Sequence, residues 1–431
     1  MDALKNPYSP GPGLAPPELA GRRDESSAFD TLLGRAANGL TSSPIMLTGL
    51  RGVGKTVLLQ SFRERAAESK WLTMSIEAEP GPKSGDSSLV RLTRELETVS
   101  RQVKREGGRG TRFSAAVAAI ESFSISLGLT GGGVSMSTRT HSPVAFDFEG
   151  ELFAVVEALS AGLTKDKSGL ALFIDEMQDF DDDVTSALVA VQHAASQRGW
   201  PFYLIGAGLP GLPRRLAAVR SYTERYAYWT IDRLTDDQSA AALTEPARRL
   251  GVRFEPAAAG LIVSEARGYP FFLQSFGYQA WLQGTDDRIT EADAETAIQV
   301  GYRGLDGFFR ARWDRATKAE RAILRLIAAS SPEPSTVTSL AARRGKPVSS
   351  LGPARRSLIE KGLVYVPERG RLALTSLGMA GFIERETAAG GDALADARET
   401  VIRDPASGFP TTRIGRPITA AQVARMIDED E

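Results

Sequence analysis

The chain has 431 residues, of which 42% are hydrophobic and 24% charged, and its formal net charge is −1. This length predicts two or three domains, and the near-neutral charge argues against a protein that coats nucleic acid with its whole surface. With no cysteine and only two isolated histidines, disulfides, a thiol nucleophile and cysteine-ligated metals are excluded and a histidine-ligated metal is disfavoured. The start does not resemble a signal peptide, and no apolar run approaches the roughly 18 residues that span a bilayer. We therefore expect a cytoplasmic protein with no membrane partner.

Residues 1–20 are rich in proline and glycine, which predicts an extended arm. The next segment starts with Gly21 and Arg22 and leads into apolar residues at helical spacing between Phe29 and Leu33. A basic turn at this point predicts that Arg22 contacts a nucleotide. The alternative is a solvated helix start.

A glycine-rich loop between a predicted strand and a predicted helix is the strongest signal in the chain. The apolar run Ile45–Leu47 precedes it, Val57–Phe62 follows it, and Gly49–Thr56 fits G-x-x-x-x-G-K-[ST] in full. Glycines let backbone N–H groups point at a phosphate, and a helix N-terminus favours anions. Lys55 would bridge the phosphates as a catalytic residue, and the Thr56 hydroxyl would ligate Mg²⁺. The residues predicted to bind ATP here are Gly49, Gly52, Val53, Gly54, Lys55, Thr56 and Val57.

Strand and helix patterns alternate after this loop, which predicts a parallel sheet covered by helices. Residues 107–145 interrupt the alternation. Period-two patterns at Phe123–Leu127 and Val134–Ser137 flank the glycines of Thr130–Gly133, so we expect a β-hairpin insertion. It is either a surface for a partner or a decoration of the domain.

A second apolar run, Leu170–Ile174, ends in two carboxylates. In a parallel sheet this end lies beside the glycine loop, so Asp175 would hold Mg²⁺ together with Thr56, and Glu176 would polarise the attacking water. A later buried run, Trp200–Gly208, ends in Gly206, Ala207 and Gly208, where many related ATPases carry a polar side chain that senses the γ-phosphate. We therefore expect slow hydrolysis.

Arg225 is the candidate arginine for the γ-phosphate, in cis or presented to a neighbouring subunit, with a structural ion pair as the alternative. Residues 233–312 predict a helical lid, and its helices are interrupted at Gly268, Tyr269 and Pro270. We expect Tyr269 and Pro270 to lie near the base of the nucleotide. An ordinary turn between helices is the alternative.

Three helical patterns and two short strands in residues 313–386 predict a winged helix, and residues 387–431 predict a linker and a tail with a last helix at Ile418–Asp430. The third helix of such a module enters the major groove, and the turn between its strands meets phosphate. The residues predicted to bind DNA are Lys346, Arg355, Arg356, Arg369 and Arg371. Alternatively, the module closes the nucleotide pocket or binds protein.

Together these motifs resemble AAA+-type ATPases of the origin-recognition-like and archaeal-ATPase kind, which grade into the STAND signal-transduction ATPases. The resemblance covers about residues 18–385, and the opening of the chain looks like that of bacterial ATP-binding proteins of this type. It rests on the winged helix and on four motifs, namely Gly21-Arg22, Gly49–Thr56 as Walker A, Leu172–Glu176 with Gln178 as Walker B, and Gly268–Pro270.

The resemblance implies an α/β fold, a P-loop NTPase with a three-layer parallel sheet, followed by a helical lid and the winged helix. The expected domains are 1–20, 21–232, 233–312, 313–386 and 387–431. It also implies ATP and Mg²⁺ as cofactors, and a lid angle that differs between the ATP and ADP states. The lid helix at Phe271–Phe276 has no arginine where many AAA+ proteins place a second sensor, which again favours a slow switch.

The leading hypothesis is thus an ATP-binding switch with slow ATPase activity that binds double-stranded DNA through the winged helix. A STAND-like signalling or scaffold ATPase, with a protein partner or self-association, is the alternative. A small-molecule kinase is disfavoured because it would leave the lid and the winged helix unexplained.

Overall fold

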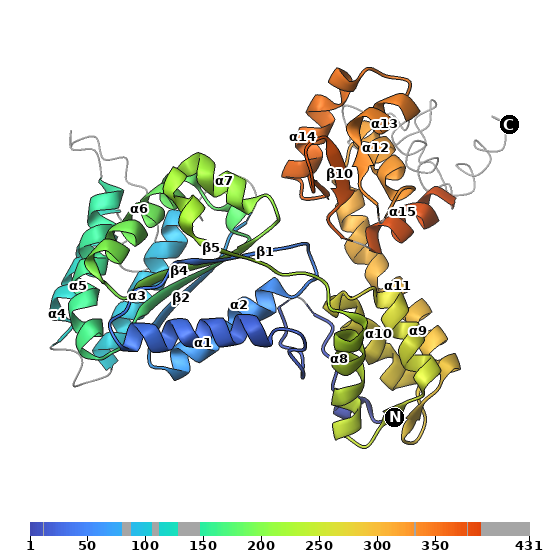
Figure 1. Cartoon of the computed structure of the whole chain (residues 1–431), viewed down its shortest axis with the longest axis horizontal. Helices are drawn as coiled ribbons and strands as arrows, with labels where there is room; N and C mark the ends of the chain where they lie inside the picture. Colours follow the sequence, from blue (N-terminus) through green and yellow to red (C-terminus); the bar gives the residue numbers. More distant parts are fainter. Residues whose placement is uncertain are drawn as a thin grey trace, which may run out of the picture. The chain divides into compact units, whose positions relative to one another are not determined.

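A computed structural model of the chain describes residues 1–11, 13–79, 88–105, 112–127, 147–331, 333–376 and 378–388. The chain divides into two compact units between Gly304 and Leu305, inside one continuous helix (Figure 1). Each unit is described by itself below. Among the described residues, no helix is both long and apolar enough to cross a membrane.

The first unit is built on a five-stranded parallel sheet in the order β2-β3-β4-β1-β5. The strands are β1 (Ile45–Thr48), β2 (Leu72–Glu77), β3 (Leu170–Asp175), β4 (Phe202–Gly208) and β5 (Ala227–Thr230). β1, β3 and β4 are buried along their whole length, which explains why their sequences are continuous apolar runs. Because the strands are parallel, the carboxyl ends of β1, β3 and β4 meet at one edge of the sheet.

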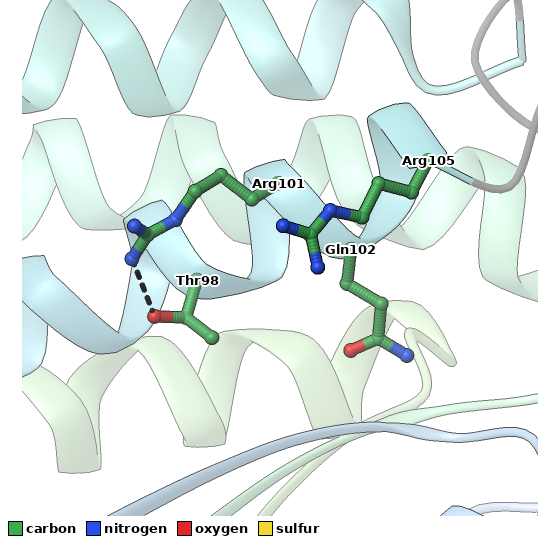
Figure 2. A pocket seen from close by; sticks show the side chains of 4 residues that line it. All are labelled: Thr98, Arg101, Gln102 and Arg105. Carbon is green, nitrogen blue, oxygen red and sulfur yellow. Dashed lines mark hydrogen bonds between the residues drawn. The ribbon is translucent and has the colours of Figure 1, made fainter.

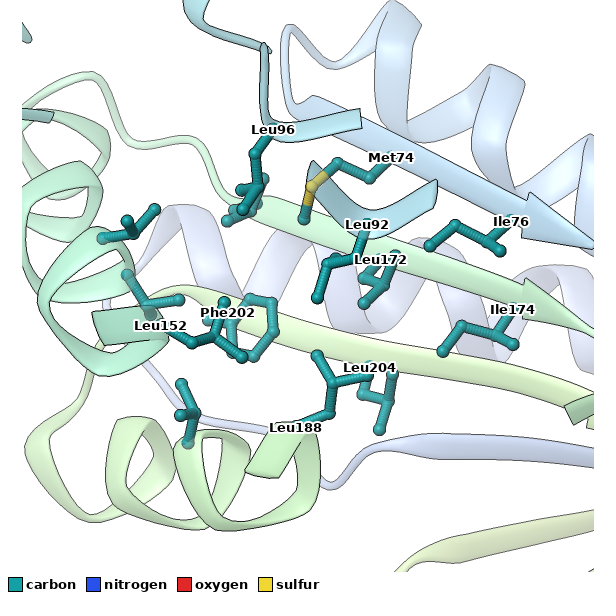
Figure 3. Packing of buried hydrophobic residues seen from close by; sticks show 14 of the residues in the cluster. Met74, Ile76, Leu92, Leu96, Leu152, Leu172, Ile174, Leu188, Phe202 and Leu204 are labelled. Carbon is teal, nitrogen blue, oxygen red and sulfur yellow. The ribbon is translucent and has the colours of Figure 1, made fainter. Parts of the chain in front are cut away.

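Helices cover both faces of this sheet (Figure 1). Adjacent residues of β3 point to opposite sides: Leu172 joins the large apolar core, and the Phe173 ring lies against Phe29 on the other face. That other face is covered by α1 (Arg23–Ala37) and α2 (Lys55–Glu68). Five helices contribute to the large core, part of which Figure 3 shows: α3 (Ser88–Arg105), α4 (Ser114–Ser126), α5 (Phe148–Lys165), α6 (Asp182–Arg198) and α7 (Leu212–Val219). The predicted three-layer arrangement is confirmed.

The predicted hairpin insertion is wrong in its first strand. Residues Phe123 to Ser126 belong to helix α4, where Ile120 and Phe123 are buried at helical spacing. Ile125, the middle residue of the period-two pattern, is 54% exposed, which a strand buried on that face would not allow. The second strand, Val134–Ser137, lies outside the described residues.

The lid of the first unit is helical, as predicted. It contains α8 (Asp236–Arg249), α9 (Pro256–Ala266), α10 (Pro270–Gln283) and the start of α11 (Glu291–Trp313). A short parallel pair, β6 (Arg253–Phe254) with β7 (Arg288–Ile289), ties the loops between these helices together and was not predicted. Thr235 and Gln238 form a reciprocal capping box that fixes where α8 begins.

The N-terminal arm packs on this lid. The Met1 ammonium donates to the carbonyl of Gly284 at 2.8 Å, and the Ser9 N–H donates to the Gln274 side chain at 3.1 Å. Tyr8 is buried, its hydroxyl donates to the Leu243 carbonyl, and its ring lies where a side chain at Gly277 would be. The arm is therefore docked, and it includes the short 3-10 helix η1 (Ala3–Lys5). Pro12 lies outside the described residues.

The second unit contains the rest of α11 and a small module of helices around an antiparallel sheet in the order β8-β10-β9. Its elements are α12 (Lys318–Ala328), β8 (Ser335–Thr336), α13 (Val337–Arg343), the 3-10 turn η5 (Val348–Leu351), α14 (Gly352–Glu360), β9 (Val364–Tyr365), β10 (Arg371–Leu374) and α15 (Gly378–Ala388). The predicted helices and strands are present, and β8 is an addition. The predicted tail helix lies outside the described residues.

An ion pair inside this module links the start of α12 to the end of α14. The Lys361 Nζ lies 2.6 Å from Glu320 Oε2, and the Glu320 side chain is 5% exposed. Although burial raises the pKa of Glu320, hydrogen bonds from Lys361, Ser357 and the Thr317 N–H outweigh burial and lower it to about 2. The carboxylate is therefore charged at neutral pH and fully paired.

Candidate nucleotide site

The glycine loop leaves β1 and enters α2 in a conformation that requires its glycines. A Cβ on Gly49 would lie 2.3 Å from the carbonyl oxygen of Ile231, so no side chain fits there. Gly54 caps α2 with a φ of 96°, a left-handed conformation that disfavours other residues. The loop therefore ends in a helix N-terminus whose N–H groups are free of side-chain caps, as an anion site needs.

Lys55 is the first residue of α2, and its side chain turns back into the loop. Its Nζ donates to the carbonyls of Gly49 at 3.0 Å and Leu50 at 2.9 Å. Burial lowers the pKa of Lys55 to about 8, against the opposing effect of Glu176 and Asp175. A buried ammonium held on two main-chain carbonyls is poised to exchange them for phosphate oxygens.

Thr56 and Asp175 are brought together from two different elements. Asp175 ends β3, is 9% exposed, and is hydrogen-bonded to the Thr56 side chain. Burial raises the pKa of Asp175, while the bonds from Thr56 and from the Glu176 N–H, at 2.8 Å, oppose that shift. A hydroxyl beside a carboxylate is the oxygen donor set that Mg²⁺ prefers, so these residues fit the ion.

Glu176 follows Asp175 in a left-handed backbone conformation, with φ 47° and ψ 40°. This conformation is uncommon for a residue with a side chain and turns the carboxylate toward the glycine loop. One of its oxygens lies 3.5 Å from the Arg51 guanidinium and the other accepts from the Gln178 amide at 2.6 Å. Arg51 was not predicted as a site residue, because the glycine-loop motif specifies no residue type at its position.

The lid turn that contains Tyr269 and Pro270 stands over the glycine loop. A Cβ built on Gly52 would lie 3.6 Å from Phe271 and 3.7 Å from Tyr269. A Cβ built on Gly54 would lie 4.0 Å from Pro270. The Leu234 N–H donates to the Gly268 carbonyl at 2.8 Å and holds the turn to the strand connection. A pocket opens between the loop, the lid and the arm, and its apolar lining includes Leu19, Val53, Val57, Pro270 and Leu273. An apolar cleft beside a phosphate loop suits a nucleobase.

Two family models match parts of the chain, and solved structures are similar to it in fold. A family model described as AAA ATPase domain matches residues 18–205, and one described as a domain of unknown function matches residues 306–383. Residues 18–205 are an AAA ATPase domain. In its fold the chain is similar to a Walker-type ATPase of Pyrococcus abyssi, at 17% identity and a TM-score of 0.56, over 85% of this chain and 96% of that one.

Two further solved structures are similar at lower scores. The RuvB Holliday junction branch migration motor of Thermotoga maritima is 17% identical, over 84% of this chain and 95% of that one, with a TM-score of 0.43. Cdc6p from Pyrobaculum aerophilum is 15% identical, over 90% of this chain and 99% of that one, with a TM-score of 0.45. No curated protein matches the chain at a significant level.

Arg22 of the AAA ATPase domain lines the pocket but its guanidinium is bonded to main-chain carbonyls. It donates to Val53 at 3.0 Å, to Asp232 at 2.6 Å and to Gly21 at 3.3 Å. Burial lowers the pKa of Arg22, against the opposing effect of Glu25 and Asp232. The side chain joins the glycine loop to the connection that leads into the lid.

Arg225 does not lie at the candidate nucleotide site of the same chain. It ends the 3-10 turn η4 (Ser221–Arg225), just before β5, and β5 starts opposite Ile45 at the amino end of β1. The glycine loop leaves the carboxyl end of β1, at the other edge of the sheet. Arg225 is exposed and makes no ion pair within the described part of the chain, so neither the cis assignment nor the structural ion pair gains support from its position.

A separate hollow lies on the AAA ATPase domain along α3. It is lined by Thr98, Arg101, Gln102 and Arg105, and Arg101 donates to the Thr98 hydroxyl at 3.0 Å (Figure 2). All four side chains come from one helix. They share no residue with the glycine loop, the lid or the arm.

Proposed function

We propose that the protein is an ATP-dependent switch with slow hydrolysis whose second unit binds double-stranded DNA. Lys55 and the N–H groups at the start of α2 would hold the phosphates, and Thr56 and Asp175 would hold Mg²⁺, which when bound neutralises charge on phosphate oxygens. Glu176 would orient and polarise the water. The support is that all four side chains converge at one end of the sheet, beside an apolar cleft.

The DNA part of the proposal is carried by a local excess of positive charge. Residues 305–388 contain fifteen lysines and arginines against eight aspartates and glutamates, in a chain whose net charge is −1. Such a patch attracts the DNA backbone and releases counterions. The element order α12, β8, α13, α14, β9, β10 supports interpreting the module as a winged helix, with α14 as its third helix.

Exposure and ion pairing favour three of the five residues predicted to contact DNA. Lys346, Arg356 and Arg369 are exposed and form no ion pair with another described residue. Arg371 lies 3.4 Å from Glu368, and Arg355 is half-buried. We therefore assign phosphate contacts to the first three side chains and a supporting role to the other two.

The alternative, a signalling ATPase whose second unit binds protein, is favoured by one observation. Val348, in the turn before α14, is 47% exposed, and an apolar side chain there suits a protein surface better than a phosphate backbone. This reading keeps the nucleotide site and changes only the partner. In trans, Arg225 would then be a candidate contact to a neighbouring subunit.

Binding of labelled duplex DNA at two salt concentrations, with ATP or ADP present, tests the proposal. We expect tighter binding with ATP and a steep loss of affinity with salt. In Arg356→Ala/Arg369→Ala the slope of log affinity against log salt should fall by about two, because each lost phosphate contact removes roughly one.

The matched control is Arg101→Ala/Arg105→Ala on α3, which removes the same charge from the exposed hollow in Figure 2. It should leave the slope unchanged. Tight ATP binding with no salt-dependent association, or an equal loss in both double variants, would contradict DNA binding and turn the search to a protein partner.

A further inference from the structure

Gln178 connects the ends of two central strands. It lies in the 3-10 turn η3 (Met177–Asp179), which follows β3. Its amide nitrogen donates to Glu176 Oε2 at 2.6 Å and to Asp179 Oδ2 at 3.1 Å. Its amide oxygen accepts from the Leu209 N–H at 3.0 Å, directly after β4. All the contacts of this amide therefore lie at the edge of the sheet that carries the nucleotide site.

The orientation of this amide is fixed by chemistry. Turned over, its oxygen would face the two carboxylates of Glu176 and Asp179, and its NH₂ group would face the Leu209 N–H. Both arrangements are repulsive. The NH₂ group must therefore point at Glu176, as one of the two groups that hold that carboxylate.

The backbone at the end of β4 is shaped to admit Gln178. A Cβ on Gly208 would lie 2.6 Å from the Gln178 amide oxygen and 3.0 Å from a Leu212 methyl carbon. The backbone of Gly208 does not have the positive φ that would itself demand glycine. The Gly208 carbonyl also accepts from the Gly49 N–H at 3.2 Å, so this point of β4 is bonded to the glycine loop.

We propose that Gln178 is a positioning residue for hydrolysis, which holds the Glu176 carboxylate in register with the end of β4 and hence with the glycine loop. Gln178 comes from the turn after β3, and its amide lies at the end of β4, where that strand has no polar side chain of its own. The inference rests on the proposed ATPase role of Glu176 and deepens it. Because Gln178 acts through Glu176, its removal should lower kcat and leave the affinity for ATP nearly unchanged.

Three variants test the assignment in steady-state and single-turnover hydrolysis. Gln178→Ala should lower kcat about tenfold to a hundredfold, the range expected when a reacting group shifts by about 1 Å, with ATP affinity within about threefold. Gly208→Ala changes no polar side chain of the site, but its added Cβ displaces the Gln178 amide. It should therefore lower kcat as Gln178→Ala does. Gln197→Ala, on the exposed side of α6, is the control and should match the wild type.

Gln178→Glu separates the donor from the acceptor. It keeps an oxygen for the Leu209 N–H and replaces the donor to Glu176 by a second carboxylate. As the pH falls, the new side chain gains a proton and can donate again, so its kcat relative to the wild type should rise. A merely structural role would not produce this pH profile.

The outcomes distinguish the inference from the function on which it rests. If Glu176→Gln abolishes hydrolysis while Gln178→Ala and Gly208→Ala stay within about twofold of the wild type, Gln178 has no positioning role. If Glu176→Gln itself leaves the rate unchanged, or the wild type binds ATP without any hydrolysis, the proposed ATPase mechanism fails and the inference fails with it.

Discussion

Lys55 holds a positive charge inside the glycine loop at a cost that a bound phosphate would remove. Its pKa is lowered from 10.5 to about 8 by burial, so the charged form is less stable in the folded chain than in the unfolded one. Below pH 8 the buried charge destabilises the folded state by the full amount, because Lys55 is charged in both states. This destabilisation disappears as the pH rises toward 10.5. A shift of this size corresponds to about 3 kcal/mol.

We therefore expect Lys55→Met to raise the melting temperature of the nucleotide-free protein at pH 7, because it keeps the apolar stem and removes the buried charge. The difference from the wild type should shrink toward pH 10. ATP with Mg²⁺ should raise the melting temperature of the wild type and not of the variant. Thermal unfolding at the two pH values, with and without ATP, measures both effects. A variant that melts lower at pH 7, or still responds to ATP, would show that Lys55 is not a strained phosphate ligand.

The sequence predicts the site residues that have a fixed spacing and misses those that only the fold brings together. Walker A residues share one loop, so Lys55 and Thr56 follow from the pattern alone, and Asp175 follows from the rule that parallel strands end at one edge. Two other contacts depend on strand register: the hydrogen bond between Gln178 and the Leu209 N–H, and the ion pair between Arg51 and Glu176. The sequence shows that β4 ends without a polar side chain, but not that the turn after β3 supplies one.

Among the elements, the N-terminal arm differs most from what composition indicates. Its prolines predict an extended segment, but Ala3–Lys5 form a short 3-10 helix. The contacts of the arm with α8 and α10 join residues more than two hundred positions apart. No local pattern encodes such contacts. The hairpin error has the opposite cause: the local period-two pattern at Phe123–Leu127 was real, yet a helix that buries Ile120 and Phe123 was more stable.

The docked arm predicts a coupling between Tyr8 and nucleotide binding. Four residues that follow the docked part also line the pocket beside Val53: Pro16, Glu18, Leu19 and Ala20. Undocking Tyr8 would therefore loosen one wall of this candidate nucleobase pocket. Tyr8→Ala removes a buried ring, and we expect about 3 kcal/mol less stability of the docked arm and a weaker affinity for ATP by about tenfold.

Titration of fluorescent ATP measures the affinity, and limited proteolysis of the arm measures docking. Tyr8→Phe, which loses only the hydroxyl bond to Leu243, should lie between the wild type and Tyr8→Ala. Leu4→Ala is the matched control, since Leu4 is 96% exposed in the same arm. Equal ATP affinity in Tyr8→Ala and Leu4→Ala would mean that the arm docks without supporting the pocket.

One helix, α11, connects the two units. α11 begins in the lid and ends in the basic second unit, and the boundary falls next to Gly304. Gly301 of the same helix lies against the Phe276 ring, and a Cβ there would be 2.7 Å from it. Close packing therefore requires glycine at this position. Gly304 and Gly307 have no atom within 4 Å of an added Cβ. Packing therefore does not require these two glycines, and each weakens the helix by roughly 1 kcal/mol relative to alanine.

We expect this part of α11, weakened by its two glycines, to transmit the nucleotide state to the second unit, where DNA binding is proposed. Gly304→Ala/Gly307→Ala should stiffen the helix and reduce the ratio of DNA affinities with ATP and ADP by about fivefold, a coupling loss of about 1 kcal/mol. ATP affinity in the absence of DNA should stay unchanged, because neither glycine contacts the nucleotide pocket. Gly260→Ala is the matched control, since Gly260 lies inside α9 with equally open space around it. A double variant whose ATP-to-ADP ratio equals that of Gly260→Ala would show that α11 transmits the state as a rigid rod, and would move the flexible joint to the connection between β5 and α8.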